Sequence, residues 1–150
     1  MYGDKVRIVW KHFPLDFHPK APMAHLATAA AAEQGKFWPM HDKIFGAQDK
    51  MDRAQYEQYA KDLGLDLKRF KESLDTAHGK AVIDADIAEA KSVGVTGTPA
   101  FFVNGRFLSG AKPFNEFAAV INAELQKQNI PIPPAAQQAL AAPGGGAPGK

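Results

Sequence analysis

The residue types that most often carry chemistry in proteins are sparse in this chain of 150 residues, which contains no cysteine. Its five histidines follow no His-Glu-x-x-His or other close ligand spacing, and a zinc site without cysteine would need several of them to converge. Nor do the three serines near apolar segments lie in a nucleophile-elbow motif. The sequence therefore predicts no metal, no cofactor and no hydrolase triad among these candidates: His12, His18, His25, His41, His78, Ser73, Ser92 and Ser109.

The chain also has no residue that can carry out thiol chemistry. Disulfide exchange requires a thiolate, and serine, threonine or methionine cannot replace it in attack on a disulfide sulfur. Because the chain has no cysteine, we expect no catalytic residue and no dithiol–disulfide activity from this polypeptide alone.

The most informative stretch runs from Gly94 to Gly110. Ala100–Val103 and Arg106–Leu108 are short runs rich in β-formers, separated by the dipeptide Asn104-Gly105. Asn-Gly tolerates the positive φ angles of a type I′ turn, so this pattern predicts a β-hairpin. Pro99 begins the first strand, where a missing N–H costs least, and from the local pattern alone it is most simply an edge-strand proline.

The segment Val95-Thr96-Gly97-Thr98-Pro99-Ala100-Phe101-Phe102-Val103-Asn104-Gly105, with a helix after Pro113, resembles the proline loop, hairpin and last helix of DsbA-like thiol-disulfide oxidoreductases. Two upstream segments resemble the same family in the same order. They are Val6-Arg7-Ile8-Val9-Trp10-Lys11-His12-Phe13-Pro14-Leu15 and Phe37-Trp38-Pro39-Met40-His41-Asp42-Lys43-Ile44-Phe45. The resemblance covers residues 3–127 and implies an α/β, thioredoxin-like fold that lacks the first, cysteine-bearing strand–helix unit.

The resemblance also implies a binding site. It implies a cis bond between Thr98 and Pro99, and backbone groups there that hold extended or unfolded polypeptides by strand addition. The expected substrate-binding residues are Val95, Thr96, Gly97, Thr98 and Pro99.

Helical patterns fill the chain between the first predicted strand, Val6–Trp10, and the hairpin. We expect helices over 22–34, 39–45, 53–63, 67–74 and 82–93, with Asp52 and Asp66 as N-caps and Asp86 on an outward face. These helices form an insertion over 20–93 of a domain spanning 1–129, whose last helix covers 113–128. The Pro-, Gly- and Ala-rich tail, 130–150, is expected to be disordered.

Aromatic side chains of the insertion have two interpretations. At helical spacing they are most often core residues, but they could also line a groove for hydrophobic peptides. The set is Phe37, Trp38, Phe45, Tyr56 and Tyr59.

Charge and hydropathy limit the classes of partner that we expect for this chain, and the resemblance indicates its location in the cell. With 18 basic and 16 acidic residues the formal charge is +2, too balanced to indicate nucleic acid or an anionic membrane as the main partner. No apolar run is long enough for a membrane span, and the first residues do not have a signal peptide's pattern. The resemblance implies a periplasmic or extracytoplasmic location.

Two functions remain open at this point. The chain is expected to be the C-terminal portion of an oxidoreductase whose cysteines lie outside it, or else a redox-inactive peptide-binding module. In either case the strand edges left unpaired by the missing unit predict self-association.

Overall fold

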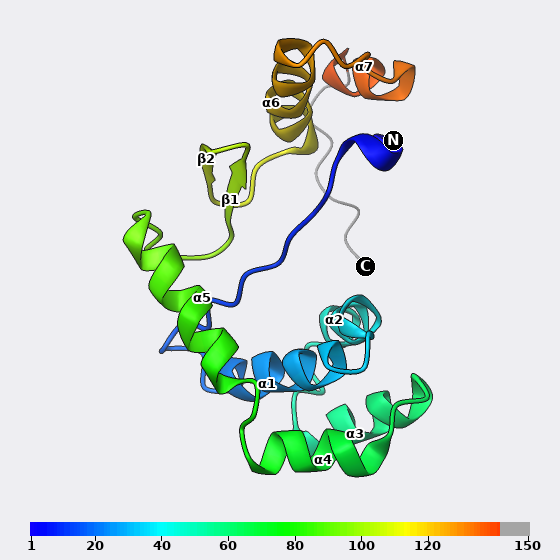
Figure 1. The fold of residues 1–150 in the computed structure, drawn as a ribbon, viewed down its shortest axis with the longest axis vertical. Helices are drawn as coiled ribbons and strands as arrows, with labels where there is room; N and C mark the ends of the chain where they lie inside the picture. Colours follow the sequence, from blue (N-terminus) through cyan, green and yellow to red (C-terminus); the bar gives the residue numbers. More distant parts are fainter. Residues whose placement is uncertain (142–150) are drawn as a thin grey trace. The chain divides into compact units, whose positions relative to one another are not determined.

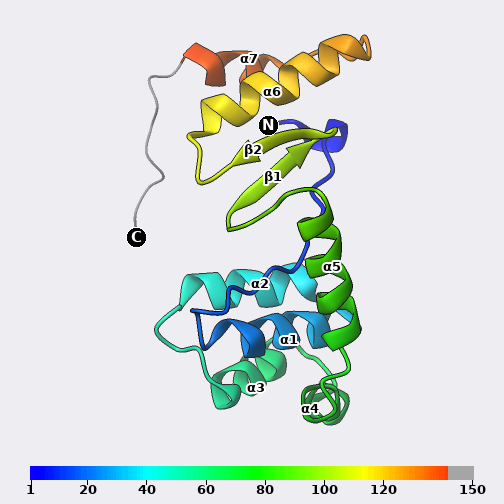
Figure 2. The same cartoon turned by 90° about the vertical axis from the view of Figure 1, so that its left-hand side faces the viewer.

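The structure is a computed structural model that describes residues 1–141. It divides into two compact units, one formed by residues 11–96 and the other by residues 1–10 together with the chain from residue 97 onward. The predicted insertion, 20–93, lies inside the first unit. Each unit has its own elements, which Figures 1 and 2 label along the chain.

The unit of residues 11–96 consists of five helices joined by short loops (Figure 1). Two of them begin at predicted aspartate caps: the Asp52 carboxylate accepts the Gln55 N–H at 2.9 Å and the Asp66 carboxylate accepts the Arg69 N–H at 3.0 Å. Both caps are therefore confirmed. The helices are α1 (Ala21–Ala32), α2 (Phe37–Gly46), α3 (Arg53–Asp62), α4 (Leu67–Asp75) and α5 (Lys80–Ser92).

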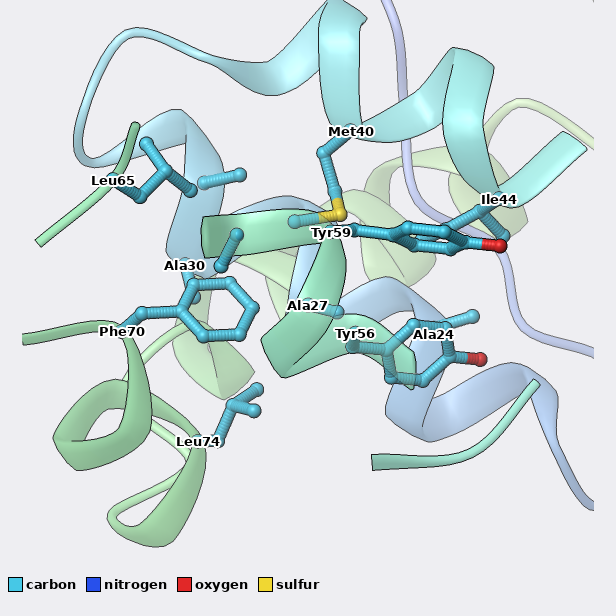
Figure 3. Packing of buried hydrophobic residues seen from close by; sticks show 12 residues of the cluster. Ala24, Ala27, Ala30, Met40, Ile44, Tyr56, Tyr59, Leu65, Phe70 and Leu74 are labelled. Atoms are coloured by element: carbon cyan, nitrogen blue, oxygen red, sulfur yellow. The ribbon is translucent and has the colours of Figure 1, made fainter. Parts of the chain in front are cut away.

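Alanines on α1 form the floor of the core of this unit. Because their side chains are short, helices α2, α3 and α4 can approach α1 closely, and their larger residues fill the space above it. Figure 3 shows Met40 and Tyr59 stacked over this alanine face, with Phe70 and Leu74 on the α4 side. Tyr56, Phe70 and Met40 are the largest fully buried side chains.

The other unit contains the hairpin. Its elements are a short 3₁₀ turn, η1 (Gly3–Lys5), strands β1 (Ala100–Val103) and β2 (Arg106–Ser109), and helices α6 (Phe114–Lys127) and α7 (Pro134–Ala141). The strands pair antiparallel with Val103 opposite Arg106. Asn104 and Gly105 have φ angles of 47° and 84°, as a type I′ turn requires, so the predicted hairpin is confirmed.

Asn122, on α6, joins three parts of this unit. Its side-chain oxygen accepts the Tyr2 hydroxyl at 2.9 Å, and its amide nitrogen donates to the Ala136 carbonyl on α7 at 3.3 Å. Asn122 is buried, and Ala136 is fully buried against α6. The N-terminal turn and α7 are thus both held to α6 by one amide.

The predicted disorder of the tail is wrong for its first part. Pro134 suits the first turn of a helix, and the alanines after it favour one, so α7 forms and buries Ala136 on α6. The rest of the predicted tail, 142–150, lies outside the described residues.

The predicted strand at Val6–Trp10 is also wrong. Among the described residues the sheet has two strands only, β1 and β2, and residues 6–10 are not part of it. An apolar segment becomes a strand only when a neighbour completes its ladder hydrogen bonds, and neither β1 nor β2, the two strands of residues 1–141, pairs with this segment. Ile8 and Val9 are accordingly 73% and 61% exposed.

Candidate functional site

The five residues of the predicted binding loop differ in their surroundings. Val95, in the helical unit, is buried, and its N–H donates to the Ala90 carbonyl at 2.9 Å after Gly94 turns the chain with a φ of 82°. Val95 therefore lies just beyond α5 and caps a carbonyl of its last turn, and its own side chain is buried. Thr96, the next residue, is exposed.

Residues 97–99 belong to the hairpin unit and lead directly into β1. Thr98 and Pro99 are exposed, and the peptide bond between them is cis. The Pro99 carbonyl accepts the Gly110 N–H at 2.9 Å, which continues the hairpin ladder by one pair beyond the strands.

The register of the hairpin determines which backbone groups of β1 remain unpaired. In an antiparallel pair closed by a two-residue turn, residues beside the turn are hydrogen-bonded partners, and such pairs then alternate with non-hydrogen-bonded ones. Val103 and Phe101 thus bond to β2, whereas Ala100 and Phe102 direct their N–H and C=O groups away from it. We call these outward groups the β1 edge. No strand in residues 1–141 pairs with it.

Apolar side chains flank the β1 edge. Phe101 is 39% exposed and contacts the Phe117 ring of α6, with 4.7 Å between ring centroids. Phe102, 45% exposed, lies on the opposite face beside Phe107, 5.0 Å away on β2. The strand itself carries no charge that would repel an added apolar strand.

A second group of polar residues lies in the helical unit. The Nδ1 atoms of His12 and His25 are 2.8 Å apart, and the backbone N–H of His12 donates to one Asp86 oxygen at 2.9 Å. The Lys11 ammonium lies 3.0 Å from the other Asp86 oxygen and 2.8 Å from Glu89. We call Lys11, His12, His25 and Asp86 the histidine cluster.

Burial determines the protonation of the two rings. Desolvation lowers the pKa of His12, and the nearby Asp86 carboxylate opposes this shift only in part. Desolvation, helped by the neighbouring His12, lowers the pKa of His25 to about 4. Hydrogen bonds to Glu89 and Asp86 raise the pKa of Lys11, which stays charged. The cluster is therefore a neutral ring pair beside an ion pair at neutral pH.

The helical pattern misplaced Asp86, which is buried with 7% of its surface exposed. The prediction that it faces outward is wrong, because its carboxylate accepts the His12 N–H and pairs with Lys11. A signal was present in the sequence: Asp86 lies three residues after the inward Ile83 and beside Ile87, on the inner face of the helix. The contact between His12 and His25 could not be identified from their spacing in the sequence.

Two of the aromatic residues of the insertion are core residues, as the first interpretation predicts, and two others are exposed. Tyr56 and Tyr59 are buried in the core, so they do not line a groove. Trp38 and Phe45 are 42% and 56% exposed on α2, where the Phe45 ring stacks on His41 at 4.4 Å.

Neither group of residues is a metal centre in the described part of the chain. No three histidine, cysteine, aspartate or glutamate side chains in residues 1–141 come together as metal ligands. In the same residues, no helix has both the length and the apolar character needed to cross a bilayer.

Comparisons with known proteins identify the family. The family model described as a DSBA-like thioredoxin domain matches residues 19–122. A crystal structure of a thioredoxin-like oxidoreductase from Silicibacter pomeroyi superposes with a TM-score of 0.69 at 23% identity, covering 79% of this chain and 68% of that one. This likeness supports the thioredoxin-like fold.

Two curated relatives have transporter names. The chain is 50% identical over 111 residues to Na(+)/H(+) antiporter NhaA 3 of Salinispora tropica, covering 73% of this chain and 17% of that protein. It is 40% identical over 122 residues to Na(+)/H(+) antiporter NhaA of Herminiimonas arsenicoxydans, covering 81% and 19%. The chain thus spans less than a fifth of the length of these relatives. Since the family model matches well over half of its residues, the chain belongs to the DSBA-like thioredoxin domain family.

Proposed function

We propose that this chain holds extended polypeptides along the β1 edge, as the peptide-binding portion of an extracytoplasmic thiol-disulfide oxidoreductase of the DsbA type. The supporting observation is the register of the hairpin, in which no strand of residues 1–141 pairs with the outward backbone groups of Ala100 and Phe102, directly after the exposed Thr98–Pro99 segment. An extended peptide can add to such an edge through main-chain hydrogen bonds, with apolar side chains beside it.

Within the predicted loop, the proposed contacts come from Thr96, Gly97, Thr98 and Pro99. Val95 takes a supporting role because its side chain is buried and its N–H is bonded to Ala90. The sulfur chemistry of the family must come from cysteines elsewhere, since this sequence has none.

Two proline variants test the binding mode. Phe102→Pro removes an N–H from the β1 edge, whereas Phe107→Pro removes the equivalent outward N–H from the opposite edge of the hairpin. Both lose the same ring contact, between Phe102 and Phe107, and neither removes a hairpin hydrogen bond, so they are matched in these two respects.

Binding is measured as fluorescence anisotropy of a labelled, cysteine-free decapeptide that alternates valine and threonine. We expect Phe102→Pro to weaken binding at least about tenfold. The peptide would form two or more main-chain hydrogen bonds between uncharged groups along the β1 edge, and the proline disrupts them. Phe107→Pro should bind as the unmodified chain does. Equal affinities for both variants, or no binding by the unmodified chain, would contradict the proposal.

A second candidate is a peptide-binding module without redox chemistry. The similarity to parts of two proteins named Na(+)/H(+) antiporters favours it, because a module of this kind can be one portion of a larger transporter. Thiol oxidation separates the two candidates. A longer form of the protein that oxidises a dithiol peptide supports the oxidoreductase, and one that binds the peptide without oxidising it supports the module. Turnover by the present chain alone would contradict both.

A further inference from the structure

The histidine cluster lies where the segment of residues 11–20 meets two helices of the same unit. His25 is on α1, Asp86 is on α5, and Lys11 and His12 begin the segment itself. Within the described residues, the other backbone hydrogen bonds of this stretch form local turns, such as those from His18 to Leu15 and from Ala21 to His18. Among the described residues, the polar attachment of the segment to the helices is therefore made at Lys11 and His12.

The contact between the two rings sets a limit on how many protons they can hold. Two Nδ1 atoms at 2.8 Å need one proton between them, supplied by one ring and accepted by the lone pair of the other. A pair with one added proton keeps this bond, because an imidazolium N–H can donate to a neutral ring. With two added protons both nitrogens are donors, the acceptor is lost, and two positive charges face each other.

The Asp86 carboxylate can offset one added charge on the ring pair, but within residues 1–141 no second carboxylate faces the rings to offset another. Asp86, on α5, faces His12 and favours its protonation, while Lys11 opposes it, and the Glu89 carboxylate is turned toward Lys11. On the α2 side the neighbour is the uncharged Phe37 ring, 6.0 Å from His12, with His41 beyond it at 6.1 Å from Phe37. On α1, the titratable group that faces His12 is its partner in the ring pair, His25.

We propose that the His12–His25 pair is an acid-operated latch, which holds residues 11–20 on α1 and α5 when it carries at most one added proton and releases them when both rings are protonated. Release takes up the second proton from solvent and replaces the ring–ring hydrogen bond by hydrogen bonds from each ring to water. The lowered pKa values of both rings agree with a closed state that resists this second proton. Exposure of the segment should then rise as the solution is acidified below about pH 5.

Two measurements on the full chain follow the latch directly. Long-range ¹H–¹⁵N spectra of the histidine rings report the protonation of His12 and His25, with the exposed His18 as an internal reference. Hydrogen–deuterium exchange between pH 7 and pH 4, expressed as protection factors, reports opening of residues 11–20. We expect protection in this segment to fall at least tenfold together with the second ring protonation, while protection in α3 and α4 stays unchanged.

A matched pair of variants tests the cause. In His25→Gln the amide can still bond to the His12 ring but takes up no proton, so the acid-dependent loss of protection in residues 11–20 should disappear. His18→Gln removes an exposed histidine of the same segment and should keep the response of the unmodified chain. The latch is overturned if both rings of the unmodified chain become protonated without loss of protection, or if His25→Gln opens with the same pH dependence. Should His25→Gln fail to fold, the first of these two results decides.

Discussion

Asp86 is the residue on which the polar contacts of the histidine cluster converge. It is buried, accepts a backbone N–H from His12 and pairs with the Lys11 ammonium, and it lies on a helix whose other aspartate, Asp84, is exposed and pairs with Lys80. Burying a carboxylate is favourable only when such partners are present, and each partner in turn depends on the carboxylate.

Replacing Asp86 and Asp84 in turn therefore compares what a buried and an exposed aspartate contribute to the free energy of unfolding. Asp86→Ala leaves the His12 N–H without its acceptor in a buried place, and we expect a loss of about 1–3 kcal/mol in the free energy of unfolding. Asp84→Ala removes an exposed i,i+4 ion pair and should change that free energy by less than about 0.5 kcal/mol. Urea unfolding at pH 7 measures both. Equal effects of the two substitutions would show that Asp86 makes no special contribution.

Gly79 is required by a close contact and not by its backbone conformation. A Cβ at this position would lie 2.5 Å from the Ala29 Cβ on α1, and its φ of −69° is accessible to any residue. Gly79→Ala should destabilise the unit by about 1–3 kcal/mol, since α5 must move away from α1. Gly46→Ala, at the end of α2 with nothing within 4 Å, is the control and should be neutral or slightly stabilising. A neutral Gly79→Ala in urea unfolding would contradict the tight α1–α5 junction.

At the scale of elements, the sequence predicted local structure well wherever one short pattern determines it. The Asn104-Gly105 turn and the Asp52 cap each depend on a few adjacent residues, and both form as predicted. The errors concern pairing over distance. Val6–Trp10 has the composition of a strand, but a strand needs a neighbour that composition does not reveal. The partner of Asp86 lies 74 residues away in the sequence, beyond the range of any helical period.

Helix α7 was missed for the same reason, because its stability comes from α6. Asn122→Ala removes the amide that bonds to both Tyr2 and Ala136, and we expect it to lower the stability of this unit by about 1–3 kcal/mol. Hydrogen–deuterium exchange should show the largest loss of protection in α7. Gln126→Ala, an exposed amide on the same helix, is the control. Unchanged protection in α7 after Asn122→Ala would mean that apolar burial of Ala136 alone holds the helix.

At the scale of the whole molecule, the β1 edge also predicts self-association. An uncharged strand with unpaired outward groups and exposed phenylalanines can pair with the same strand of another copy. We expect the sedimentation coefficient to rise with protein concentration, and Phe102→Pro to abolish this rise while Phe107→Pro preserves it. A chain that sediments as a monomer at every concentration up to about 100 μM would contradict the prediction.

The whole molecule should also lose stability in acid, and the direction follows from the lowered pKa of the partly buried His25. The pKa of His25 is lowered from 6.5 to about 4 in the folded chain, so between these two values the unfolded chain binds more protons. Stability from this group is fully present above pH 6.5 and is lost as the pH falls toward 4. After allowance for the partial solvent contact of the ring, we expect a loss of about 1–2 kcal/mol across this window.

Carboxylates contribute to the loss of stability in a separate, more acidic pH range. Hydrogen bonds to Arg53 and Lys71 lower the pKa of Glu57, and a hydrogen bond to Arg53 lowers the pKa of Asp75. The stability from these pairs is therefore lost only as the pH falls below the ordinary pKa values of carboxylates. We therefore measure the free energy of unfolding in urea at pH 7, 6, 5 and 4. Between pH 7 and pH 5 its change reports the histidines, because the carboxylates contribute only at lower pH. His25→Gln should flatten the curve between pH 7 and 5, whereas His18→Gln should leave its slope unchanged. A curve for His25→Gln that falls as steeply as that of the unmodified chain would assign the acid sensitivity to other groups.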